Sequence, residues 1–207
     1  MPSKKELIMQ KLIYIISFLN VCIFQAVWGG ACVASSGVNE LAPASFIGKM
    51  VNESLGIVNN SGSSDDKKRK ELSNSINKYL DIDRIASAVF SPKGYKDLSE
   101  KDQQRVKEYL KKYLIRFYAS EGKLSAMMNS KLSGEPVAER KNEQDFAVTT
   151  QFEKNSSPAL KIVWITDGKK VFYVEIEGIN QIITLRSEMD TAIGSRTLME
   201  YINEQGF

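Results

Sequence analysis

The chain has 207 residues, with 28 basic and 25 acidic side chains and a mean hydropathy of −0.26, which suits one domain with a substantial core. It contains no histidine, and both of its cysteines lie within the first 34 residues. For residues 35–207 this excludes histidine-based triads, cysteine nucleophiles, histidine or cysteine metal sites and a disulfide framework. The nearly balanced charge argues against a nucleic-acid partner, which would require a concentrated basic face.

The N-terminal segment has the three parts of a secretory signal. Lysines precede an apolar run at residues 12–27, and small residues follow at 29–34. The run is short for a membrane span and ends in Gly-Gly rather than in a basic flank. We therefore expect residues 1–34 to be a cleaved signal peptide and residues 35–207 to be one exported domain. A retained membrane helix and acylation at Cys32 are the alternatives.

Apolar residues then recur at helical spacing through the first half of the chain. The pattern predicts one helix over residues 44–59. A second helix is expected to begin after the cap residue Ser64, because the next residues are acidic and favour a helix N-terminus. Asp81 or Asp83 is expected to cap a third, short helix that ends at Phe90.

A longer helix is expected after a loop that contains Pro92 and Gly94. Ser99, followed three residues later by Asp102, resembles a capping box and marks its start. Apolar side chains recur along one stripe of this helix at Val106, Tyr109, Leu110, Tyr113, Leu114 and Phe117.

Beyond Gly134 the apolar period changes to two, which predicts strands. The expected strands are residues 136–140, 145–152, 160–166 and 170–177, with turns at 155–158 and at Asp167-Gly168. Helices followed by antiparallel strands predict an α+β fold. We expect the N-terminal helices to pack on one face of a curved antiparallel sheet, with C-terminal helices after the sheet.

In the last predicted strand, Phe172, Val174 and Ile176 are expected on one face. Gly178 interrupts this strand and permits a bulge or a close backbone approach. A second apolar, strand-like segment follows.

Arg186 is expected to open a helical pattern after that segment, with Met189 and Ile193 four residues apart. Ser195 is interpreted as a simple cap of the last helix.

Two sets of positions, in this order and at this spacing, carry a family resemblance. The first is Asp81, Ile82, Arg84, Ile85 and Ala86. The second is Glu177, Gly178, Ile179, Ile182, Ile183, Arg186, Met189, Leu198 and Ile202. Together they resemble the periplasmic phospholipid-carrier family, which includes the toluene-tolerance proteins and the soluble lipid shuttle of the Mla pathway. The resemblance spans residues 64–207, and Tyr173 and Asn180 depart from the aspartate and serine that are common in the family.

The resemblance implies a carrier without catalysis, cofactor or metal, in which an apolar cavity between sheet and helices receives the acyl chains of a phospholipid. The candidate lining residues are the apolar positions of the predicted strands and of the long helix. They are Val106, Leu110, Tyr113, Phe117, Phe146, Val148, Phe152, Ile162, Trp164, Phe172, Val174 and Ile176. The alternative is that these residues close a dry core, because every α+β domain needs such stripes.

The family resemblance also implies a location and partners. The protein would work in the periplasm and shuttle diacyl phospholipid between the inner and outer membranes. Its partners would be an inner-membrane ABC transporter complex with its substrate-binding component, and an outer-membrane lipoprotein complex.

The polar candidates are few. Arg186 could contact a phosphate headgroup through its forked guanidinium, or form an ion pair with Glu188 or Glu177. Arg84 is expected to be held in capping interactions of its own helix. The basic residues 67–70 are interpreted as a solvated face, with a docking patch for an acidic partner or anionic lipid as the alternative.

Two other functional classes remain open at this point. A small α+β enzyme could use Asp145, Glu175 or Glu177 as a general base whose pKa is raised by an apolar pocket. A periplasmic chaperone or adaptor could instead bind apolar peptides in an open groove or at a sheet edge.

Overall fold

The helices of the N-terminal half begin and end close to the predicted positions. A computed structural model describes residues 41–118, 129–154 and 157–207, so the predicted signal peptide lies outside the described residues. The first elements are α2 (Leu41–Asn59), α3 (Asp65–Tyr79), α4 (Ile82–Phe90), the short 3-10 helices η1 (Ser91–Lys93) and η2 (Tyr95–Asp97), and α5 (Glu100–Tyr118).

Two of the predicted helix caps are confirmed. The Ser64 hydroxyl accepts a hydrogen bond from the Lys67 amide at 3.4 Å, and the Asp81 carboxylate accepts one from the Arg84 amide at 3.0 Å. Asp81, not Asp83, is therefore the cap of α4. Both caps satisfy amides that a helix leaves unpaired at its start.

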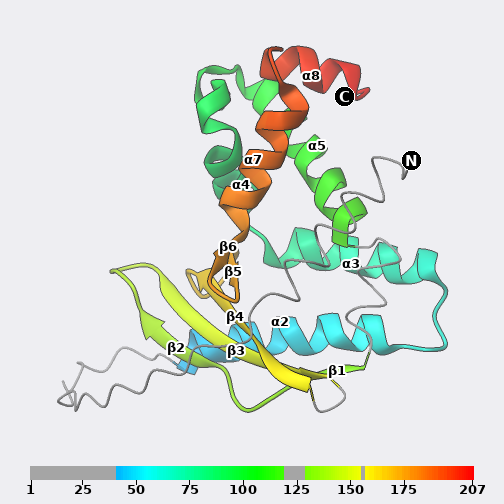
Figure 1. Cartoon of the computed structure of the whole chain (residues 1–207), viewed down its shortest axis with the longest axis vertical. Coiled ribbons are helices and arrows are strands. Elements are labelled where there is room, and N and C mark those ends of the chain that lie inside the picture. Colours follow the sequence, from blue (N-terminus) through cyan, green and yellow to red (C-terminus); the bar gives the residue numbers. More distant parts are fainter. Residues whose placement is uncertain (1–40, 119–128, 155–156) are drawn as a thin grey trace, which may run out of the picture. The chain divides into compact units, whose positions relative to one another are not determined.

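The strands form one antiparallel sheet (Figure 1). They are β1 (Ser130–Leu132), β2 (Val137–Arg140), β3 (Phe146–Lys154), β4 (Ser157–Thr166), β5 (Val171–Ile176) and β6 (Ile179–Asn180). Their order is β1-β3-β4-β5-β6, and β2 pairs with the same edge of β3 as β1. The turn at Asp167-Gly168 joins β4 to β5 as predicted, and the α+β fold class is confirmed.

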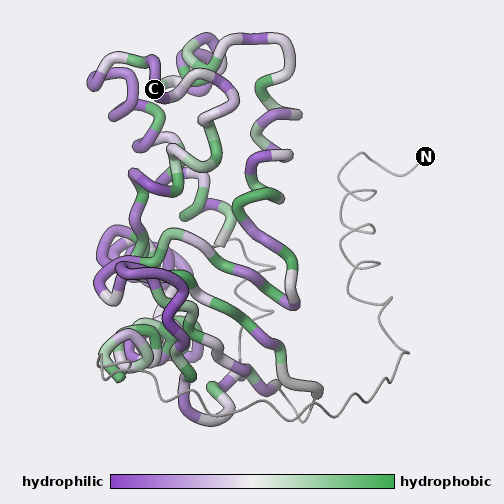
Figure 2. The backbone as a smooth tube through the Cα atoms, turned by 90° about the vertical axis from the view of Figure 1, so that its left-hand side faces the viewer, coloured by the Kyte–Doolittle hydropathy of each residue, from purple (hydrophilic) through white to green (hydrophobic). Residues whose placement is uncertain are grey.

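The buried apolar residues fall into two cores. The sheet core joins α2 to the sheet and contains Ile47, Met50, Val51, Leu55, Tyr79, Val148 and Val171. The helical core lies among α4, α5 and the C-terminal helices and includes Ile85, Phe90, Val106, Leu110, Met189, Ile193 and Ile202. Leu80, at the junction of α3 and α4, packs against both cores. Hydrophobic and hydrophilic residues alternate along helices and strands alike, as expected for elements with one buried face (Figure 2).

A β-bulge in β5 changes the predicted face of Phe172. Thr166 pairs with Val171, whereas its neighbour Ile165 pairs with Tyr173, so Phe172 is the extra residue of the bulge. Phe172 packs against the helical core, and Val171 joins Val174 on the side of the sheet core. The prediction that Phe172 shares a face with Val174 and Ile176 is therefore wrong.

Gly178 serves a tight hairpin turn. Ile176 pairs directly with Ile179, which leaves Glu177 and Gly178 as a two-residue loop. Both have positive φ, 50° and 75°, as a type I′ turn requires. The local twist of such a turn matches the twist of the flanking strands.

The helix after this hairpin begins earlier than predicted. α7 (Gln181–Ile193) starts directly after β6, because the Asn180 side chain accepts hydrogen bonds from the amides of Ile182 and Ile183. The apolar segment after Asn180 is thus helical, and Arg186 lies within α7 instead of at its start.

The cap of the last helix also differs from the prediction. α8 (Leu198–Glu204) is capped by Thr197, whose hydroxyl accepts from the Glu200 amide while the Glu200 carboxylate accepts from the Thr197 amide. This is a complete capping box. The interpretation of Ser195 as a simple cap is wrong.

Candidate functional site

One face of β3, β4 and β5 carries apolar side chains in cross-strand register. Val148 pairs with Trp164, which in turn pairs with Val174. One step further along the strands, Thr150 pairs with Ile162 and Ile162 with Ile176, and Phe152 then pairs with Leu160. Because directly paired residues share a face, these positions form one surface, which we call the inner face. The inner face comprises Val148, Thr150, Phe152, Leu160, Ile162, Trp164, Val174 and Ile176.

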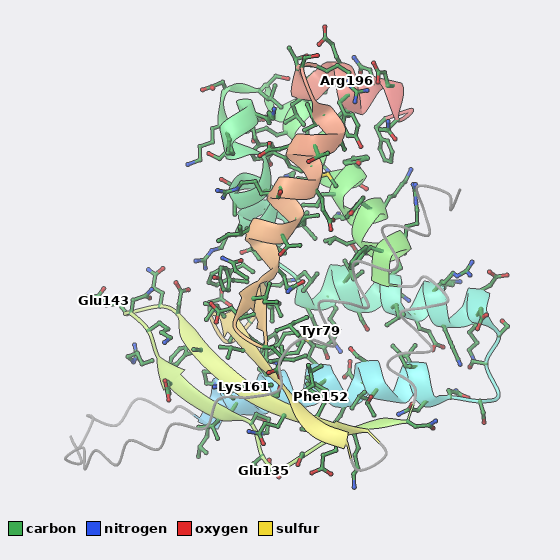
Figure 3. The ribbon with its side chains drawn as sticks, in the orientation of Figure 1. Tyr79, Glu135, Glu143, Phe152, Lys161 and Arg196 are labelled. Carbon is green, nitrogen blue, oxygen red and sulfur yellow. The ribbon has the colours of Figure 1, made fainter. Side chains whose placement is uncertain are left out.

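The inner face is closed at one end and accessible at the other. Val148 is 0% exposed, because the sheet core with α2 residues such as Ile47 and Val51 covers it. Phe152, labelled in Figure 3 beside α2, is half-buried and packs against the edge of this core. At the other end Leu160 is 41% exposed and Ile176 is half-buried, and neither belongs to a core. The apolar surface therefore extends beyond the part that α2 covers.

The polar atoms on the inner face bond to one another. The Trp164 indole Nε1 donates to the Thr150 hydroxyl at 2.8 Å, and that hydroxyl donates to the Ile162 carbonyl at 3.4 Å. Thr150 is 2% exposed. Since these groups are already paired, contact with a hydrocarbon chain would leave none of them without a partner.

A contact with α3 holds α2 in its place. The Tyr79 hydroxyl donates to Glu53 of α2 at 2.5 Å, and Lys78 forms an ion pair with the same carboxylate at 2.8 Å. The bonds from Lys78 and then Tyr79 keep the pKa of Glu53 below its usual value. Phe46 meets the Tyr79 ring edge to face, with ring centroids 5.7 Å apart. The helix that covers the closed end of the inner face is thus fixed by polar and aromatic contacts.

Apart from Phe117, the sequence-predicted lining residues fall into two groups in the structure. The first group lies on the inner face or, for Phe146, next to it on the same face of β3: Phe146, Val148, Phe152, Ile162, Trp164, Val174 and Ile176. The other group lies at the helical core: Val106, Leu110, Tyr113 and Phe172. Val106 and Leu110 are each 0% exposed there, and their helix α5 packs against α3, α4 and α8.

Tyr113 and Phe117 form a pair of stacked rings on α5, with centroids 6.2 Å apart. The Tyr113 hydroxyl donates to Glu188 of α7 at 2.9 Å, and both rings are half-buried. They are therefore more accessible than Val106 and Leu110, which lie earlier in the same helix.

Sequence reasoning missed Leu160 and Thr150 as members of the inner face. Leu160 could have been found, because it continues the period of two backward from Ile162. Thr150 carried no such signal, since its polar side chain suggested solvent. Its bond with Trp164 accounts for its burial.

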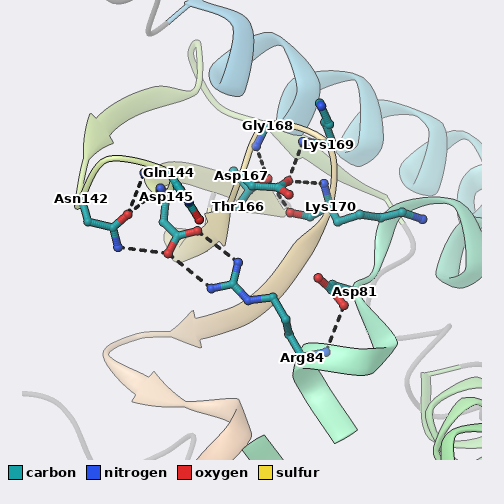
Figure 4. Close-up of polar contacts among 10 residues, drawn as sticks. All are labelled: Asp81, Arg84, Asn142, Gln144, Asp145, Thr166, Asp167, Gly168, Lys169 and Lys170. Atoms are coloured by element: carbon teal, nitrogen blue, oxygen red, sulfur yellow. Dashed lines mark hydrogen bonds and ion pairs between the residues drawn. The ribbon is translucent and has the colours of Figure 1, made fainter. Parts of the chain in front are cut away.

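Asp145, one of the carboxylates considered as a general base, does not have the required environment. Arg84 of α4 donates to both oxygens of Asp145, at 3.1 and 3.3 Å, and Asn142 adds a third bond at 3.0 Å (Figure 4). The Arg84 bonds hold the pKa of Asp145 below its usual value, whereas a base in an apolar pocket needs a raised pKa. Glu175 accepts from the Tyr173 hydroxyl on the opposite face of the sheet.

The expected capping role of Arg84 is confirmed for its backbone amide, which donates to Asp81. Its guanidinium reaches Asp145 instead. Arg186 makes different contacts from those expected. Arg186 donates from both Nε and Nη2 to the Ala88 carbonyl of α4. Neither Glu188 nor Glu177 pairs with it, and among the described residues no carboxylate lies within ion-pair distance of Arg186.

Among the described residues, no cluster of acidic side chains has the arrangement needed to hold a metal ion. No helix in the same ranges has the length and hydropathy needed to cross a membrane.

These features define a class of α+β domain in which a helix covers one end of the apolar face of an antiparallel sheet and the other end stays accessible. The family model described as "MlaC protein" matches residues 48–204, and the chain belongs to this family. A solved structure, the phospholipid-binding protein from Ralstonia solanacearum in complex with a phospholipid, has the same fold. The likeness has a TM-score of 0.63 at 19% identity and covers 79% of this chain and 96% of that one. No curated protein matches the chain.

Proposed function

We propose that this protein binds a phospholipid with its acyl chains against the inner face and carries it between membranes. The accessible end of the inner face, where Leu160 and Ile176 expose apolar surface outside both cores, is the observation that carries the proposal. Membership of the MlaC family supports it, as does the fold shared with a protein solved in complex with a phospholipid.

The proposed contacts are confined to the half-buried part of the sheet. Phe152, Leu160, Trp164 and Ile176 would touch the acyl chains, and the Thr150 hydroxyl would stay bonded within the protein. Ile162 and Val174 lie between them, and Val148 and Phe146 close the buried end.

Tyr113 and Phe117 of α5 remain candidate contacts. Val106, Leu110 and Phe172 support the helical core instead.

Physical chemistry explains why such a carrier needs no catalytic step. Burial of the order of thirty methylene groups at ~0.8 kcal/mol each is worth about 24 kcal/mol against water. Release into water is therefore negligible. Between a bilayer and an apolar protein surface the free-energy difference is small, because the acyl chains are buried away from water in both. Lipid exchange therefore depends on docking at a membrane or at a protein that offers a water-free path.

The proposal includes the setting expected from the family. The protein would be exported to the periplasm and shuttle diacyl phospholipid between the inner and outer membranes. An inner-membrane ABC transporter complex with its substrate-binding component and an outer-membrane lipoprotein complex would be its partners. Directionality would come from these partners, because the carrier has no energy source of its own.

Native mass spectrometry of the protein purified from the cell envelope, with lipid analysis of an organic extract, tests the proposal. We expect a phospholipid in stoichiometric amount. A protein that carries no lipid and takes none up from vesicles would refute the carrier function. A bound apolar peptide in the same spectra would instead support the chaperone or adaptor class.

A further inference from the structure

A second surface feature lies on the helical side of the protein, apart from the inner face. It is an open groove of about 590 Å³ formed by α4, η1, η2 and α7. Besides the backbone at Ala88, it is lined by Asp83, Arg84, Ser87, Ser91, Lys96 and Arg186. Three of these side chains are basic and one is acidic, although the whole chain is nearly balanced in charge.

Ion pairs compensate only part of this charge. Asp83 is neutralised from outside the groove by Lys107 of α5, at 2.6 Å. Arg84 is neutralised by Asp145 at 3.1 Å. Arg186 and Lys96 form no ion pair with any carboxylate in the described ranges of the chain. Two positive charges at the groove are therefore left without a counter-charge from those residues.

The hydrogen bonds of Arg186 orient its guanidinium and leave part of it available to a ligand. Its Nε and Nη2 both donate to the Ala88 carbonyl near the end of α4, which fixes the plane of the guanidinium. The Nη1 hydrogens have no acceptor among the residues that the structure describes. The same bonds cover a carbonyl that would otherwise repel an anion at the negative end of a helix. The Arg186 side chain is thus fixed in place, while its Nη1 group can still donate hydrogen bonds to a ligand.

Two hydroxyl groups add neutral donors to the same groove. Ser87 and Ser91 are four residues apart, so they lie on the same side of α4 and its extension. Neither side chain makes a hydrogen bond to another described residue, which leaves both hydroxyls able to donate to a ligand. The groove therefore combines two uncompensated cations with two available hydroxyls.

We propose that this groove binds a phosphate group. A phosphate carries one or two negative charges and has enough oxygens to accept bonds from Lys96, Arg186 and a serine hydroxyl together, whereas a carboxylate has only two oxygens. The phosphate can come from two sources, the headgroup of an anionic phospholipid at a bilayer surface or free phosphate in solution. The inference does not require acyl chains on the inner face.

Two binding measurements on the mature protein in phosphate-free buffer test the site. The first is calorimetric titration with inorganic phosphate. The second is flotation with vesicles of phosphatidylglycerol, compared with phosphatidylcholine, at low salt because exposed charges are screened by salt. Lys96→Ala is the main variant, because Lys96 is exposed and forms no ion pair with a described carboxylate. Arg186→Lys keeps the charge but removes the fork. Lys169→Ala, on the β4–β5 turn, removes the same charge elsewhere.

We expect Lys96→Ala to weaken binding about tenfold, as loss of one charged hydrogen bond implies, and Lys169→Ala to leave it unchanged. Binding of phosphatidylglycerol vesicles that free phosphate displaces would identify the headgroup as the source. Phosphate binding without vesicle binding would identify free phosphate. No binding in either assay, or equal loss in Lys96→Ala and Lys169→Ala, would overturn the proposal.

The readouts also separate this site from the proposed carrier function. Lys96→Ala should retain as much co-purified lipid as the wild type, because Lys96 lies outside the inner face. Lipid-free protein that still binds phosphate through Lys96 would refute the carrier function alone. Lipid-loaded protein without phosphate binding would refute the groove alone.

Discussion

Arg84 of α4 and Asp145, directly before β3, form a two-bonded ion pair across 61 residues of sequence. The Arg84 guanidinium also lies 3.2 Å from the centre of the Phe172 ring, so it joins a helix to the sheet by charge and by stacking. The Asp145 side chain is only 13% exposed, which limits screening by solvent.

Replacement of Asp145 by Asn should destabilise the protein by about 1–2 kcal/mol at pH 7, because the Arg84 guanidinium loses its counter-charge and bonds an uncharged amide instead. The pKa of Asp145 is lowered in the folded protein, so its contribution is present above the usual aspartate pKa and is lost as the pH falls through the folded value. Urea unfolding at pH 7 and at pH 3 should therefore show a smaller difference between variant and wild type at pH 3. Asp66→Asn, at an exposed helix start, is the control. A difference that does not shrink with acid would contradict the ion-pair explanation.

Tyr109 and Tyr201 share a buried hydrogen bond, with their hydroxyl oxygens 2.8 Å apart. Burial, followed by this bond, raises the pKa of Tyr109 above its ordinary value. Tyr201→Phe should cost about 1–3 kcal/mol, because it leaves the Tyr109 hydroxyl buried without its partner. The double variant with Tyr109→Phe should lose less than the sum of the single changes. Additive losses in a double-mutant cycle of urea unfolding would show that the bond contributes nothing.

The cap of α8 offers a direct comparison of two nearby hydroxyl residues. Thr197→Ala removes the capping box and should lower the free energy of unfolding by about 1 kcal/mol. Ser195→Ala should change it little, because Ser195 is exposed and caps no helix. Thermal unfolding of both variants measures the difference. Equal losses would mean that the observed cap geometry does not govern the stability of this helix.

The carrier proposal predicts that the two faces of the sheet respond differently to the same change. Ile176→Gln places an amide on the accessible end of the inner face and should reduce co-purified lipid several-fold, since an unpaired amide against acyl chains costs about 1–3 kcal/mol. Val163→Gln makes the matched change on the opposite face, where Val163 pairs with Glu175. Lipid per protein is measured by phosphate analysis of organic extracts. Equal retention in the two variants would argue against the inner face as the binding surface.

The helix caps at Ser64 and Asp81 could be predicted because a cap is a local signal, read from a few consecutive residues. The bulge at Phe172 could not, because it depends on how β4 and β5 pair. The start of α7 was obscured because Ile179, Ile182 and Ile183 fit both a strand and a helix, and only the hairpin at Gly178 and the Asn180 cap decide between them.

The candidate site, too, could be predicted only where the signal was local. Alternation identified Phe152, Trp164 and Ile176 as members of one face, since period two is a property of the strand itself. The stripe on α5 predicted that Val106 and Leu110 would be buried, but a stripe does not specify which element it meets. In the structure it meets the other helices.

The bulge in β5 also links the stability of the two cores. One strand supplies Val171 and Val174 to the sheet core and Phe172 to the helical core, while Leu80 touches both. Neither core can be completed while this strand is detached. Unfolding of either one therefore removes support from the other, and the described unit is expected to unfold in a single cooperative transition, without a half-folded intermediate that would expose the inner face.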